Sequence, residues 1–147
     1  MTALVVGYGR SGKAAEALLK AQGAEVVVLA DDTRDKIGEG LFDCAVVSPG
    51  IALTHPWIVE AKRRGIPLKS ELQLGCEELK RRGWKLLAVT GSKGKSSVVK
   101  VVADAINLAG MKAVACGNYG LPVCEVAHSN NQTIKQSNNS PPTRSES

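Results

Sequence analysis

Residues 89–97 read V-T-G-S-K-G-K-S-S, a pattern with the chemistry of a phosphate-binding loop. Gly91 and Gly94 let the backbone curl so that successive N–H groups point at one anion, and a following helix directs its positive end to the same place. Lys95 offers a charge for outer phosphates, and Ser96 a hydroxyl for Mg²⁺. The longer G-x-x-x-x-G-K-[ST] pattern would need glycine where this chain has Val89, so a plain strand-to-helix turn is the alternative.

A second glycine motif, G-Y-G-R-S-G, occupies residues 7–12. It lies between the apolar run 3–6 and an expected helix whose apolar face carries Ala14, Ala15, Leu18 and Leu19. Another apolar run, 25–30, ends at two aspartates. This β-α-β order indicates a nucleotide site, with Asp32 placed to meet a ligand hydroxyl or base. Ordinary solvation of a loop is the alternative for this aspartate.

A third strand is expected at 44–48, and Pro49 and Gly50 end it. Ligands of open parallel sheets gather at the carboxyl ends of the strands. We therefore expect residues 9–12, 32–34 and 48–50 to converge on one crevice. Taken alone, Ser48-Pro49-Gly50 would be read as a plain turn.

Further elements follow along the chain. Helices are expected at 56–65 and after a Ser70 cap, with a brief strand at 66–69 between them. A domain boundary is placed near Gly83. Beyond it, strands at 86–89 and 112–116 flank a helix at 98–109, whose valines need burial on both sides. The loop residue His55 receives no role.

Composition narrows the class of protein. The net charge is +5, and the basic clusters 62–64 and 80–82 lack interleaved aromatics, so solvated helix faces are favoured over nucleic-acid binding. The four cysteines form no C-x-x-C pair, which disfavours zinc; Cys44 and Cys116 are read as small core residues. No apolar run reaches the roughly 18 residues of a membrane span, and no signal peptide is evident. We expect a cytoplasmic protein without membrane association.

Five motifs in order make the chain resemble the Mur ligase family from Met1 to about Val126: G-Y-G-R-S-G at 7–12, D-T-R at 32–34, S-P-G-I-A-L-T-H-P at 48–56, V-T-G-S-K-G-K-S-S at 89–97 and G-N-Y-G-L-P at 117–122. The 48–56 run favours the D-glutamate-adding branch. The resemblance implies an α/β fold: a Rossmann-like parallel-sheet UDP-binding domain at 1–84 and the start of a P-loop ATPase-type central domain at 85–127. The polar tail 128–147 is expected to be disordered.

The resemblance also implies roles for individual residues. Binding of the UDP-sugar would involve Gly9, Arg10, Ser11, Gly12, Asp32, Thr33, Arg34, Ser48, Pro49, Gly50 and Asn118. ATP would be held by Gly91, Ser92, Lys93, Gly94, Lys95, Ser96 and Ser97, with Lys95 and Ser96 catalytic and Ser96 on Mg²⁺. The implied substrates are UDP-N-acetylmuramoyl-L-alanine, D-glutamate and ATP. The implied reaction forms an acyl phosphate that the amine of D-glutamate attacks.

Two departures from the family pattern stand out. Lys93 occupies a position where the family usually has asparagine, which adds charge beside the triphosphate. The family's later residues, an acidic Mg²⁺ ligand, a histidine, a modified lysine and a third domain, find no counterpart, so we expect a truncated ligase without full activity. An NAD-binding module or oxidoreductase and a non-catalytic nucleotide-binding remnant are the alternatives.

Overall fold

The computed structural model describes residues 1–30, 37–117 and 120–129. Four strands form one sheet in the order β2-β1-β3-β4, and every neighbouring pair is parallel. Their bounds are β1 (Thr2–Val6), β2 (Glu25–Leu29), β3 (Cys44–Val47) and β4 (Leu68–Ser70). The predicted Rossmann-like parallel sheet is thereby confirmed.

The central strand β1 explains how the sheet is covered on both faces. Its residues 3–6 are fully buried. Ala3 and Val5 belong to one apolar cluster, whereas Leu4 and Val6 belong to a second. Because side chains alternate along a strand, these two clusters lie on opposite faces of the sheet. Continuous burial of this kind is typical of parallel strands that have helices on both sides.

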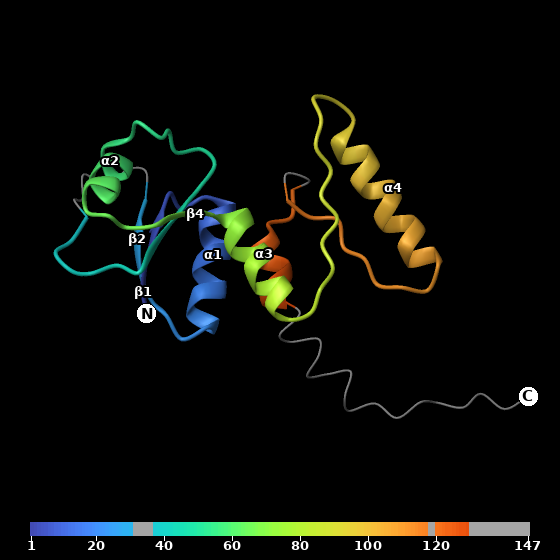
Figure 1. Ribbon diagram of the computed structural model, residues 1–147, viewed down its shortest axis with the longest axis horizontal. Coiled ribbons are helices and arrows are strands. Elements are labelled where there is room, and N and C mark those ends of the chain that lie inside the picture. The colour runs from blue at the N-terminus through green and yellow to red at the C-terminus, as the bar shows by residue number, and fades with distance from the viewer. Residues whose placement is uncertain (31–36, 118–119, 130–147) are drawn as a thin grey trace, which may run out of the picture.

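Each face has its own helices (Figure 1). The first cluster contains residues of α1 (Arg10–Ala21) and α3 (Glu71–Arg81), and the second contains residues of α2 (Pro56–Arg63). The apolar face expected for the first helix is confirmed, because Ala14, Ala15, Leu18 and Leu19 are all buried.

Short-range capping sets where two of these helices begin. The Ser70 hydroxyl accepts a hydrogen bond from the Gln73 N–H at 3.1 Å, as the sequence predicted for the start of α3. His55, which received no role from its sequence context, caps α2: its Nδ1 accepts from the Trp57 N–H at 3.3 Å. Pro56 at the first position needs no such partner.

The long helix α4 (Lys95–Leu108) stands away from the sheet (Figure 1). The strands predicted at 86–89 and 112–116 are wrong, because the structure gives both runs no regular secondary structure. A strand needs a neighbour for its backbone hydrogen bonds, and neither run belongs to the sheet of the described residues. The burial expected for the valines is also wrong: Val101 is 65% exposed, and the only buried residue of α4 is Ala103.

After α4, the chain returns to the unit formed by the sheet and helices α1, α2 and α3. Residues 123–129 are helical and contribute buried side chains to the cluster that contains α1 and α3. These side chains are Val123, Cys124, Val126 and Ala127. Two residues assigned to the polar tail, 128 and 129, lie in this helix, and the remainder of the tail, 130–147, lies outside the described residues.

Candidate functional site

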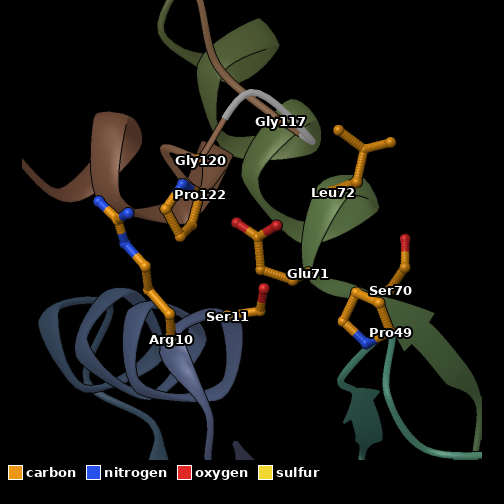
Figure 2. A pocket seen from close by; sticks show the side chains of 9 residues that line it. All are labelled: Arg10, Ser11, Pro49, Ser70, Glu71, Leu72, Gly117, Gly120 and Pro122. Atoms are coloured by element: carbon orange, nitrogen blue, oxygen red, sulfur yellow. The ribbon is translucent and has the colours of Figure 1, made fainter.

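A cavity of about 350 Å³ opens at the carboxyl edge of the sheet (Figure 2). Its walls come from the first turn of α1, the loop after β3, the junction of β4 with α3, and the chain that follows α4. The lining residues are Arg10, Ser11, Pro49, Ser70, Glu71, Leu72, Gly117, Gly120 and Pro122. This is the edge at which open parallel sheets bind ligands.

The glycines of the 7–12 motif have three different tasks. Gly7 has a positive φ of +86°, which allows the tight turn after β1. A Cβ on Gly12 would lie 2.1 Å from the Gly7 carbonyl oxygen, so this position permits close packing of the helix. A Cβ on Gly9 would meet nothing within 4 Å. The backbone at Gly9 therefore faces open space, as required for close approach of a phosphate.

The Ser48 hydroxyl, in the loop directly after the neighbouring strand β3, supports this turn. It donates a 2.9 Å hydrogen bond to the carbonyl oxygen of Gly7. The hydroxyl thus holds the loop after β3 against the glycine turn, and Pro49 next to it lines the cavity. Ser48 acts on the site through the backbone of the turn.

The first turn of α1 gives the cavity a positive character. Gly9 is the N-cap, and within the described part of the chain no side chain caps this end. The amide dipoles and the Arg10 guanidinium therefore lie beside the space that a bound anion would fill. Arg10 also approaches Glu125 of the helical segment 123–129, with 3.6 Å between Nη2 and Oε2.

Glu71 is a cavity residue for which the sequence suggested only a place at a helix start. Its side chain is buried, and its Oε1 accepts a 2.6 Å hydrogen bond from the Cys124 N–H. The carboxyl group belongs to α3, whereas the donor belongs to a segment more than fifty residues away. An acidic residue directly after a good N-cap was the available signal, but its partner is visible only in three dimensions.

The structure brings together several residues predicted for the UDP-sugar site. Arg10, Ser11 and Pro49 line the cavity described above, Gly9 and Gly12 shape the turn beside it, and Ser48 holds that turn. Gly50 is exposed directly after Pro49. Four other predicted residues, Asp32, Thr33, Arg34 and Asn118, lie outside the described residues.

The phosphate-loop candidate lies outside this cavity, at the beginning of α4. Gly94 is the N-cap with a left-handed φ of +75°, so the loop uses glycine where its backbone needs it. The Lys95 ammonium donates to the carbonyl oxygens of Gly91 and Ser92, the latter at 3.4 Å. Residues 91–94, 96 and 97 are exposed.

The surroundings of the cysteine thiols suppress their reactivity. All four cysteines are free thiols, and burial raises the pKa of Cys44, Cys76, Cys116 and Cys124, which keeps them protonated. The described residues contain no group of three or more His, Cys, Asp or Glu side chains suited to a metal ion. Within the same residues, no helix combines the length and apolar character needed to cross a bilayer.

Comparison with known proteins gives a consistent result, although no family model matches the chain. The chain is 36% identical over 147 residues to the UDP-N-acetylmuramoylalanine--D-glutamate ligase of Synechococcus sp. (strain JA-2-3B'a(2-13)), covering 84% of this chain and 30% of the relative. Equally named proteins of Chlamydia abortus and Rippkaea orientalis are each 33% identical over 85% and 90% of this chain, and 33% and 34% of their own lengths.

The chain is a relative of the Mur ligases. It spans about a third of the length of the curated relatives it matches. The resemblance drawn from five short motifs is thus confirmed over most of the chain, and the Rossmann-like unit agrees with it.

Proposed function

We propose that the cavity at the sheet edge binds the uridine diphosphate part of UDP-N-acetylmuramoyl-L-alanine, as the substrate-binding unit of a D-glutamate-adding Mur ligase. The observation that supports this most is the open backbone at Gly9 beside Arg10 and Ser11, in a chain similar to ligases of that name. An open amide turn and a guanidinium together favour a diphosphate.

Roles follow from position around the cavity. Arg10 and Ser11 would contact the nucleotide, and Pro49 and Gly50 would lie against its diphosphate. Of the predicted residues outside the described part of the chain, Asp32, Thr33 and Arg34 would hold the uridine, and Asn118 would contact the sugar-phosphate side.

We propose further that residues 91–97 bind ATP. The left-handed turn at Gly94, the exposed loop and the adjoining helix start suit a triphosphate. Lys95 would exchange its present carbonyl partners, Gly91 and Ser92, for phosphate oxygens. The Ser96 hydroxyl would hold Mg²⁺, which when bound neutralises charge on the transferred phosphoryl group.

In the complete reaction, ATP would transfer its terminal phosphoryl group to the substrate carboxylate, which forms an acyl phosphate and releases ADP. The amine of D-glutamate would then attack this group, forming the amide bond and expelling phosphate. The cavity would position the UDP-sugar, and residues 91–97 would position the ATP phosphates. Positive charge around these groups favours phosphoryl transfer between anions.

Calorimetric titration with UDP and, separately, with NAD tests the assignment of the cavity. We expect UDP to bind and NAD not to bind, and Arg10→Ala to weaken UDP binding. Arg63→Ala is the matched control, because Arg63 is an exposed arginine of α2 that pairs with Glu60 outside the cavity. Binding of NAD without binding of UDP would refute the proposal and favour a dinucleotide-binding module.

A further inference from the structure

We propose that Glu71 is a positioning residue for the nucleotide cavity. In this inference, which rests on the proposed function, its carboxylate fastens the helical segment 123–129 to α3. That attachment keeps Gly120 and Pro122, just before the segment, in place as a wall of the cavity.

A hydrogen bond joins the Cys124 N–H to the Glu71 side chain. The Cys124 N–H lies in the first turn of the segment, where helical N–H groups lack partners within their own helix. Glu71 Oε1 accepts this N–H at 2.6 Å, so a carboxylate from another element caps the segment. The Glu71 backbone carbonyl oxygen also accepts from the Cys124 thiol at 3.2 Å.

Glu71 is not needed to cap its own helix. The start of α3 already has a cap, because the Ser70 hydroxyl accepts from the Gln73 N–H. The Glu71 residue is only 6% exposed, and a buried carboxylate needs polar partners to offset its lost hydration. Figure 2 shows the carboxyl group directed from α3 into the cavity, toward the side on which Pro122 lies.

An independent contact joins α3 to the segment 123–129 one helical turn further along α3. A Cβ on Gly75 would lie 2.7 Å from the Cys124 nitrogen and 2.7 Å from the Val123 carbonyl carbon. Glycine is unfavourable inside a helix by about 1 kcal/mol relative to alanine, so its presence here needs a reason. Close docking of the segment supplies that reason, and residues 71 and 75 lie on the same face of α3.

The consequence for the cavity is direct. Gly120 and Pro122 precede the fastened residue by only a few positions and line the cavity opposite the first turn of α1. If the segment detached, this wall would be lost, and only molecules with the wall in place would bind nucleotide fully. Loss of a hydrogen bond to a charged group shifts such an equilibrium roughly tenfold or more toward the detached state, and the apparent affinity falls in proportion to the fraction of molecules that keep the wall in place.

The test compares Glu71→Ala, Glu71→Gln and Gly75→Ala with the parent protein. Two quantities are measured well below the unfolding temperature: hydrogen exchange at the Cys124 amide, and affinity for UDP. We expect Glu71→Ala and Gly75→Ala to accelerate the exchange about tenfold and to weaken UDP binding. Glu71→Gln is expected to restore most of both, because its amide oxygen still accepts the Cys124 N–H.

Glu77→Ala is the matched control, since Glu77 lies on the same helix, pairs with Lys69 on the surface and does not line the cavity. It should change neither quantity. Parent-like exchange and affinity in Glu71→Ala would overturn this inference alone, as would a Gln variant as impaired as the Ala variant. Failure of the parent to bind UDP would instead overturn the proposed function, while the exchange measurement would still report on the attachment.

Discussion

Glu78 is the carboxylate whose loss we expect to cost this fold most. It is almost fully buried, with 2% of its side chain exposed, and lies at the junction of three elements. Arg81 donates to both of its oxygens, at 2.7 and 2.8 Å, and Gln22, the C-cap residue directly after α1, donates at 2.9 Å. Arg82 donates at 2.5 Å and also reaches the Ala127 carbonyl oxygen of the segment 123–129 at 2.8 Å.

The size of the effect follows from the proton affinity of this group. The Arg81 hydrogen bonds, with further help from Arg82 and Gln22, lower the pKa of Glu78 from 4.5 to about 2. Because a tenfold change in proton affinity corresponds to about 1.4 kcal/mol, the ionised carboxylate stabilises the fold by up to about 3 kcal/mol. Arg81 is largely exposed, so screening by water lowers this to about 2 kcal/mol.

The pH dependence has a definite sign. A carboxyl group whose pKa is lower in the folded state stabilises fully above its unfolded pKa of 4.5 and loses that contribution as the pH falls toward 2. In Glu78→Gln this contribution is absent at every pH. The difference in unfolding free energy between the parent and the variant should therefore be constant from pH 7 to about 5 and shrink below pH 4.5.

Urea unfolding followed by circular dichroism, at pH 7 and at pH 3, measures this difference. The matched control is Glu60→Gln, because Arg63 donates to both Glu60 oxygens at 2.7 Å in the same helical spacing but at an exposed site. Its unfolding curve should remain close to that of the parent. Equal stability of Glu78→Gln and the parent at pH 7, or a difference that does not change at pH 3, would refute the reasoning.

Four further substitutions have distinct expected results. Gly12→Ala should destabilise the fold by about 1–3 kcal/mol in urea unfolding, because its Cβ would meet the Gly7 carbonyl oxygen, whereas Gly9→Ala should fold normally and weaken only UDP binding in calorimetry. His55→Ala should lower stability by about 1 kcal/mol through loss of the α2 cap, measured as a lower Tm. Lys95→Ala should weaken ATP binding roughly tenfold while leaving the Tm of the nucleotide-free protein unchanged, and unaltered ATP affinity would contradict the phosphate-loop assignment.

The local sequence pattern was sufficient to predict the first elements of the sheet and its helices. Three features were predictable: the apolar run that forms β1, the glycine turn after it, and the helical spacing of the buried hydrophobic residues of α1, which are Ala14, Ala15, Leu18 and Leu19. Their physical basis is short-range, since strand burial, turn geometry and helix periodicity depend on neighbours in sequence. The convergence of Arg10, Ser11 and Pro49 also followed, because parallel connections bring strand ends to one edge.

Contacts between distant parts of the chain were decided by the tertiary structure. Apolar runs such as 86–89 read as strands from composition, yet strands form only where a partner supplies hydrogen bonds, and here none is paired among the described residues. The bond from the Cys124 N–H to Glu71 and the close approach at Gly75 join residues about fifty positions apart. Sequence spacing carries no information on such pairs, because packing geometry alone determines which surfaces meet.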